Sequence, residues 1–233
     1  AVTRLQLETD LRRALEREEL TIYYQPIVSF TSGHLTGFEA LVRWNHPERG
    51  LVPPGAFIPL AEETGLVVPI GEWVIGEACR QSAEWRDGVG KNLPVTMSVN
   101  LSGRDFQDTD VVSRLDAILK RTGLQPEMLK AEITESIFME DGNSNIETLE
   151  KIKELGVRLH IDDFGTGYSS LSYLIRFPVH GIKLDRSFVS GLDEDATKHK
   201  IVGAVVTLAH NLGFTVTAEG IERVAEQESL QAL

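Results

Sequence analysis

Short apolar runs of strand character alternate with longer amphipathic runs of helix character through most of this 233-residue chain. Repeated strand–helix alternation predicts a mainly parallel sheet covered by helices. The expected strands are 21–29, 35–44, 95–101, 129–133, 158–161, 181–184 and 215–218. The expected helices are 56–63, 69–86, 111–122, 145–155, 169–177, 196–212 and one that begins near residue 224.

The connections and the length favour a closed α/β barrel. A short connection with a turn at Thr31-Ser32-Gly33 joins the first two strands, which predicts an antiparallel hairpin at the start of the sheet. Barrels of alternating strands and helices commonly have about this length. An open doubly wound sheet is the alternative, but no glycine-rich phosphate loop follows the first strand. No linker divides the chain, so we expect one domain over residues 1–233.

Composition narrows the class of protein and of partner. The chain is 42% hydrophobic and 25% charged, as ordinary globular proteins are. No apolar run approaches the roughly 20 residues that cross a bilayer, so we expect no membrane contact by this domain. The net charge of −12 disfavours a nucleic-acid polymer as partner, because such binding needs a basic surface.

A single cysteine, Cys79, fits a reducing compartment and hence a cytoplasmic location. Because the first residue is Ala1 and not Met, we expect a longer parent protein, which could itself be anchored in a membrane.

Two adjacent acids, Asp162 and Asp163, come directly after the expected strand 158–161, and the glycines Gly165 and Gly167 follow. Neighbouring carboxylates at the end of a buried strand repel each other and lose hydration. A cation or a hydrogen-bond network offsets that cost. A single Asp at a strand end is most often a helix cap or a turn residue, so the pair needs support from the rest of the chain.

Polar side chains at the other strand ends supply that support. The carboxyl ends of barrel strands converge on one mouth, where active sites lie. The residues there or within the second strand are Glu39, Asn100, Glu132, Glu135, Asp162, Asp163, Lys183, Asp185, Glu219 and Glu222. The candidate ligands are six oxygen donors with no histidine or cysteine among them, a donor set that suits Mg²⁺ or Mn²⁺: Glu39, Asn100, Glu132, Asp162, Asp163 and Glu219. Five carboxylates exceed the needs of one ion, so we expect two ions at the site.

With these residues assembled, the chain resembles the EAL domain family, the bacterial cyclic di-GMP phosphodiesterases. The resemblance covers essentially the whole chain, and the agreement of several ordered motifs makes it specific. The matching motifs are Glu39-Ala-Leu-Val-Arg-Trp44, Ser98-Val-Asn-Leu-Ser102, Glu132-Ile-Thr-Glu-Ser136, Asp162-Asp-Phe-Gly-Thr-Gly-Tyr-Ser-Ser170, Ile182-Lys-Leu-Asp185 and Ala218-Glu-Gly-Ile-Glu222.

The resemblance implies a modified TIM (β/α)8 barrel with an antiparallel first strand, and hydrolysis of cyclic di-GMP to linear pGpG. It implies that two Mg²⁺ or Mn²⁺ ions are held by Glu39, Asn100, Glu132, Asp162, Asp163 and Glu219. In this scheme Lys183 orients the attacking water. Glu219 is the candidate general base, although metal activation alone could produce hydroxide. The catalytic residues that the resemblance implies are Glu219, Lys183 and Glu39.

The resemblance also implies ligand contacts, a regulatory loop and a homodimer. The expected substrate-binding residues are Gln25, Leu41, Arg43, Asp185 and Glu222. The expected regulatory loop comprises Phe164, Gly165, Thr166, Gly167, Tyr168 and Ser169, anchored by Glu135. The last strand of the family's barrel is missing from this sequence, which ends at Leu233, so we expect the native chain to continue.

Two other functions compete with the phosphodiesterase. Degenerate members of the family bind cyclic di-GMP without cleaving it, but such members lack some metal-binding or loop residues, whereas this chain has all of those quoted above. An unrelated metal-dependent barrel, such as an enolizing enzyme, shares an acid cluster but does not explain the matching motifs. Hydrolysis is therefore the expected function, and a catalytically inactive receptor domain is the alternative.

Overall fold

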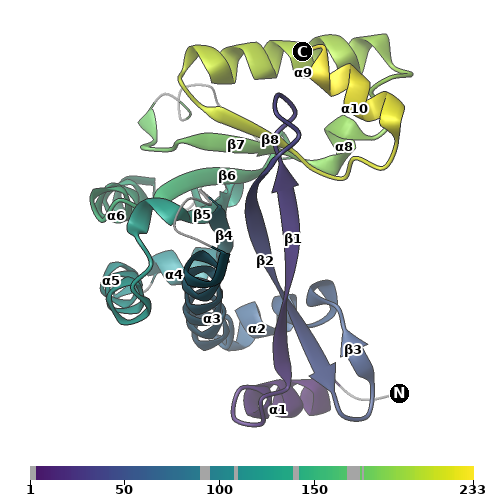
Figure 1. The fold of residues 1–233 in the computed structure, drawn as a ribbon. Coiled ribbons are helices and arrows are strands. Elements are labelled where there is room, and N and C mark those ends of the chain that lie inside the picture. Colours follow the sequence, from purple (N-terminus) through teal and green to yellow (C-terminus); the bar gives the residue numbers. More distant parts are fainter. Residues whose placement is uncertain (1–3, 90–94, 108–109, 139–141, 167–173, 175) are drawn as a thin grey trace. The chain divides into compact units, whose positions relative to one another are not determined.

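The computed structural model describes residues 4–89, 95–107, 110–138, 142–166, 174 and 176–233 (Figure 1). It contains two compact units. The first comprises Ala1–Val28 and Leu35–Lys130, and the second comprises Ser29–His34 and Ala131–Leu233. None of the helices in the described ranges combines the length and apolar character needed to span a membrane.

The first unit is built on a sheet with the order β1-β2-β4, with the short strand β3 paired to the far end of β2. β1 and β2 are antiparallel, as predicted, whereas β2 and β4 are parallel with Glu39 opposite Ser98. The elements are α1 (Arg4–Ala14), β1 (Leu20–Val28), β2 (Leu35–His46), β3 (Gly50–Val52), α2 (Pro54–Thr64), α3 (Val67–Val89), β4 (Thr96–Leu101), α4 (Gly103–Gln107), α5 (Val111–Thr122) and the 3-10 turn Pro126–Met128.

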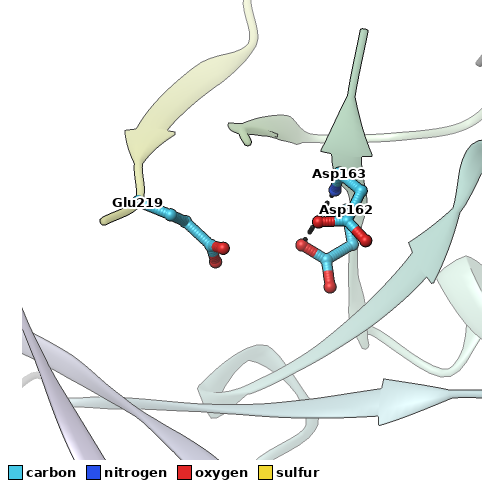
Figure 2. A group of neighbouring side chains, drawn as sticks. All are labelled: Asp162, Asp163 and Glu219. Atoms are coloured by element: carbon cyan, nitrogen blue, oxygen red, sulfur yellow. Dashed lines mark hydrogen bonds between the residues drawn. The ribbon is translucent and has the colours of Figure 1, made fainter. Parts of the chain in front are cut away.

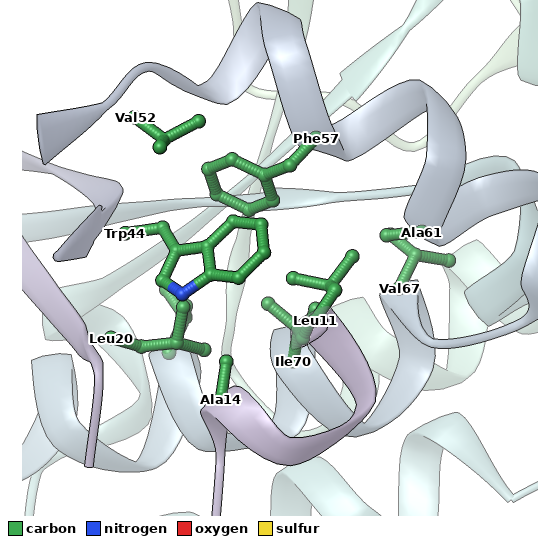
Figure 3. Packing of buried hydrophobic residues seen from close by; sticks show 10 residues of the cluster. Leu11, Ala14, Leu20, Trp44, Val52, Phe57, Ala61, Val67 and Ile70 are labelled. Atoms are coloured by element: carbon green, nitrogen blue, oxygen red, sulfur yellow. The ribbon is translucent and has the colours of Figure 1, made fainter. Parts of the chain in front are cut away.

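The core of the first unit explains why its elements pack where they do. Trp44 is fully buried, and its ring contacts that of Phe57 edge-on at a centroid distance of 5.7 Å (Figure 3). The indole N–H of Trp44 donates a 3.0 Å hydrogen bond to Glu19 Oε2, which satisfies its only polar group. Leu11 and Ala14 of α1 pack in the same cluster. One face of β2 is therefore committed to the core.

The second unit holds strands in the order β5-β6-β7-β8, and the pairs β6–β7 and β7–β8 are parallel. Among the described residues, α6 lies between β5 and β6, and α8 and α9 lie between β7 and β8, as parallel crossovers require. The elements are β5 (Leu129–Thr134), which begins at the boundary between the units, the 3-10 turn Glu135–Phe138, α6 (Gly142–Glu154), β6 (Arg158–Phe164), β7 (Gly181–Leu184), α8 (Arg186–Val189), α9 (Ala196–Asn211), β8 (Thr215–Ala218) and α10 (Val224–Gln231).

All seven predicted strands are present, and the α/β class with an antiparallel first strand is confirmed. The predictions missed α1, the short helices α4 and α8, and β3, whose three residues are too few to show a periodic pattern. β6 runs to Phe164, three residues beyond its predicted end, so Asp162 and Asp163 lie within the strand. Most of the predicted helix 169–177 falls outside the described residues. The strand expected beyond Leu233 stays a prediction.

Candidate active site

A β-bulge places Asp162 and Asp163 together. Ile161 lies opposite Ile182 and Phe164 lies opposite Leu184, so two aspartates of β6 face the single residue between them on β7. Asp163 has a φ of 50°, which is rare for a residue other than glycine. Adjacent residues of a regular strand point to opposite faces. Here the bulge redirects the chain, as bulges beside active sites commonly do.

Glu219 completes a group of three acids in the second unit. It follows β8 directly, and its backbone N–H donates a 3.1 Å hydrogen bond to the Leu184 carbonyl oxygen. Asp162, Asp163 and Glu219 each offer one carboxylate oxygen, and these oxygens lie within 4.8 Å of one another. Figure 2 shows the three side chains pointing toward a common space. The register of β7 with β8 thus brings together residues that are more than 50 positions apart in sequence.

Lys183 of β7 links three of the site acids. Its ammonium nitrogen lies 2.6 Å from Glu132 Oε2, 2.6 Å from Glu219 Oε1 and 3.1 Å from Asp162 Oδ1. Lys183 is 2% exposed and Glu132 is 1% exposed, so these charges are shielded from water. Ion pairs in such surroundings are screened little by salt. One buried cation therefore positions three carboxylates at once.

The donor set of the second unit fits a divalent cation. Asp162, Asp163, Glu132 and Glu219 supply four carboxylates, against which Lys183 supplies one positive charge. The carboxylate oxygens of Asp162, Asp163 and Glu219 are close enough together to coordinate one ion that prefers oxygen ligands. The excess of negative charge makes cation binding favourable. The site can therefore hold a divalent metal ion.

Two predicted metal ligands, Glu39 and Asn100, lie together in the first unit. The Asn100 side-chain N–H donates a 3.2 Å hydrogen bond to Glu39 Oε1. The parallel pairing of β2 with β4, in which Glu39 faces Ser98, brings the two strands' polar residues side by side. This contact places Glu39 and Asn100 side by side, while their roles as metal ligands stay predictions.

Three predicted substrate-binding residues share the face of the first unit that carries Glu39. Gln25 lies opposite Glu39 in the antiparallel register, and Arg43 lies four pairs further along β2, with Leu41 midway between them. Residues opposite each other in such a pair point to the same side of the sheet. The other side carries Trp44 and the core. Gln25, Leu41 and Arg43 are therefore placed on one face, away from the core.

The remaining two predicted substrate residues make local contacts in the second unit. Asp185 caps α8, with its Oδ1 accepting a 2.9 Å hydrogen bond from the Ser187 N–H. Hydrogen bonds from Ser187, of which the one from its side chain has the largest effect, hold the pKa of Asp185 below its usual range. Glu222 Oε1 pairs with Arg186 Nη2 at 2.8 Å on an exposed surface. Their ligand contacts stay predictions.

The described part of the expected regulatory loop is tied to Glu135. The Gly165 N–H donates a 2.7 Å hydrogen bond to Glu135 Oε1, which agrees with the predicted anchoring. Gly165 has a φ of +97°, and a Cβ there would lie 2.4 Å from the Phe188 ring. The Thr166 hydroxyl donates to the Asp163 carbonyl oxygen at 2.9 Å. Gly167, Tyr168 and Ser169 lie outside the described residues.

Glu226 is a supporting residue that the sequence interpretation missed. It is 2% exposed and accepts backbone hydrogen bonds from Gly191, Glu222 and Arg223. These bonds, of which the one from Gly191 has the largest effect, lower the pKa of Glu226 from 4.5 to about 2. The segment that follows Glu219 is thereby fixed to the start of α10. A Glu in the first turn of an expected helix was the available signal, because such residues often cap the preceding backbone.

Comparison with known proteins finds relatives that match this chain over almost its whole length. The family model described as "EAL domain" matches residues 8–233. The bifunctional diguanylate cyclase/cyclic di-GMP phosphodiesterase MucR of Pseudomonas aeruginosa is 46% identical over 233 residues, all of this chain and 34% of MucR. The cyclic di-GMP phosphodiesterase PdeR of Escherichia coli is 42% identical over 226 residues, 97% of this chain and 34% of PdeR. The chain thus spans about a third of the length of these curated relatives.

A solved structure extends the similarity to three dimensions. The PaMucR phosphodiesterase in complex with c-di-GMP superposes with a TM-score of 0.92 at 46% identity, covering 97% of this chain and 91% of that structure. This similarity confirms the predicted fold class, an α/β modified TIM barrel with an antiparallel first strand. Together with the match of the family model over nearly the whole length, it shows that this chain belongs to the EAL domain family.

Proposed function

We propose that this chain hydrolyses one phosphodiester bond of cyclic di-GMP and releases linear pGpG. The observation that carries the proposal is the contact of Lys183 with Glu132, Asp162 and Glu219 beside the bulged Asp162–Asp163 pair. Family membership and the activities named for MucR and PdeR specify the substrate. A receptor that only binds the nucleotide would not need this charged cluster to be intact.

The described side chains support specific roles in hydrolysis. A water oxygen would bond to phosphorus while the P–O3′ bond breaks, and the leaving O3′ would take a proton from solvent. We assign Glu219 as the acceptor of the water proton, because Lys183 holds its carboxylate in one position at 2.6 Å. Lys183 itself would face the charge that grows on the phosphoryl oxygens. Glu132 also holds Lys183, with its Oε2 2.6 Å from the ammonium nitrogen.

A bound divalent cation would supply Lewis acidity and lower the pKa of water at this position. Asp162, Asp163 and Glu219 are the residues that would hold it, because their oxygens converge. We further propose two ions, Mg²⁺ or Mn²⁺, with Glu39, Asn100 and Glu132 as additional ligands. That larger ligand set rests on the family resemblance.

Cellular setting and assembly are also part of this proposal. We infer a cytoplasmic location from the single cysteine, Cys79, which the structure shows to be buried and free. A homodimer is inferred from the family resemblance. Size-exclusion chromatography with light scattering at several protein concentrations tests the dimer directly.

The experiment is an assay of cyclic di-GMP with Mg²⁺ or Mn²⁺, in which pGpG is separated by chromatography. The unmodified protein should form pGpG, and Glu219→Gln should lower kcat about 10²–10⁴-fold, the usual contribution of a general base. Glu228→Gln, an exposed acid in the same unit, is the matched control and should leave kcat unchanged. Tight binding of cyclic di-GMP without turnover, at any concentration of either metal, would instead support the receptor alternative.

A further inference from the structure

Tyr23 lies on the same face of β1 and β2 as the candidate site residue Glu39. In the antiparallel register Tyr23 faces Leu41, and the next pair on that face is Gln25 with Glu39. Two residues of an antiparallel strand span about 6.8 Å, so the Tyr23 ring is one side-chain row from Glu39. Nothing in the sequence motifs assigns a role to Tyr23.

The Tyr23 ring is half exposed, and a cation lies over it. Tyr23 is 50% exposed, and Arg43 Cζ lies 5.4 Å from its ring centroid. Arg43 Nη1 also donates a 2.9 Å hydrogen bond to the Val42 carbonyl oxygen, which holds the guanidinium near the strand. The contact is of the cation–π type. The result is a half-exposed aromatic ring with a positive charge over it.

The neighbouring Tyr24 shows what a packing tyrosine looks like in this fold. Its ring meets Trp85 edge-on at 4.8 Å, on the face of the sheet turned toward α3. Burial raises the pKa of Tyr24 to about 12. Tyr24 is thus explained by the core. Tyr23, one position away, leaves half of its surface to solvent on the face that carries the predicted substrate residues.

We propose that Tyr23, together with Arg43, stacks on a guanine base of the bound cyclic dinucleotide. Aromatic side chains and arginine both stack on bases, and stacking of this kind needs no particular base edge. Arg43 can in addition donate to the O6 and N7 acceptors of guanine. A base held over Tyr23 directs the adjoining phosphodiester along the strand toward Glu39. The inference rests on the proposed function and adds a substrate-binding residue to it.

The test compares Tyr23→Ala, Tyr23→Phe and a matched control. Leu51 of β3 is 49% exposed, close to the 50% of Tyr23, and lies at the far end of β2, so Leu51→Ala controls for loss of an exposed strand side chain. KM and kcat are measured with cyclic di-GMP, and Kd is measured by calorimetry with the same ligand. Thermal unfolding of each free variant reports its folding.

Loss of stacking should raise Kd and KM about 5- to 150-fold in Tyr23→Ala, the equivalent of about 1–3 kcal/mol per base. Tyr23→Phe keeps the ring and should stay within about twofold of the unmodified protein, as should Leu51→Ala. Unchanged Kd and KM in Tyr23→Ala, beside normal turnover by the unmodified protein, would overturn the stacking role alone. Absence of both binding and turnover in the unmodified protein would overturn the proposed function and this inference with it.

Discussion

Lys183 Nζ lies 2.6 Å from Glu132 Oε2, and neither side chain is more than 3% exposed. Removing one member of a buried pair leaves the other as an uncompensated charge, which costs more than the pair contributes. Lys183 also contacts Asp162 and Glu219, so three carboxylates depend on it. Stability and activity are therefore expected to be linked at this residue.

Replacement of Lys183 by methionine should reduce both properties. We expect Lys183→Met to lower the free energy of unfolding by about 3–5 kcal/mol and kcat by about 10²–10³-fold. Urea unfolding and the pGpG assay measure the two effects. Lys200→Met, on an exposed part of α9, is the control for loss of a lysine. Wild-type kcat in a folded Lys183→Met protein would contradict the assigned role.

Divalent cations should stabilise the folded protein through the aspartate pair. A ligand that binds only the native state adds RT ln(1 + [L]/Kd), about 2.7 kcal/mol at 100 times Kd. We expect Mn²⁺ or Mg²⁺ to raise Tm, and EDTA to reverse the rise and abolish turnover. Asp163→Asn should remove most of the shift, whereas Asp87→Asn, an exposed acid, should retain it. An equal Tm shift in both variants would place the cation elsewhere.

Gly165 should tolerate no side chain. Its φ of +97° and the 2.4 Å approach of a Cβ to the Phe188 ring both oppose alanine. We expect Gly165→Ala to cost at least about 1–3 kcal/mol of unfolding free energy. Gly55→Ala is the matched control, because a Cβ at Gly55 meets nothing within 4 Å and its φ is not positive. Equal unfolding midpoints in urea for the two variants would count against the described contact.

Glu226 should make stability depend on pH in the acid range. Its pKa is lowered to about 2 in the folded state from a usual value of 4.5, so the unfolded chain binds the proton more readily. Its stabilising effect is therefore complete above about pH 4.5 and is lost as the pH falls toward 2. Urea midpoints measured from pH 6 to pH 2.5 should fall less steeply for Glu226→Gln than for the unmodified protein. Glu228→Gln, on the same helix, should keep the original slope.

Local patterns in the sequence were sufficient to predict the strands and the chemical nature of the site. Alternating apolar residues and turn signals mark each of the seven predicted strands, because both act over a few neighbouring residues. The same patterns predicted Asp162, Asp163 and Glu219 at converging strand ends, and the structure brings their oxygens together. The contact between Glu135 and Gly165 was anticipated only through the family resemblance.

Other features depended on contacts between distant residues. Alternation along a regular strand predicts that Asp162 and Asp163 point to opposite faces, and only the unequal pairing of β6 with β7 creates the bulge that turns both into one site. The position of Lys183 among three acids likewise follows from the strand register, and the burial of Glu226 follows from its packing against Gly191. The sequence determines which residue types are available for the chemistry, whereas the distances between them and their burial arise only when separate strands pair. The physical reason is that register and desolvation are properties of assembled segments and not of any one of them.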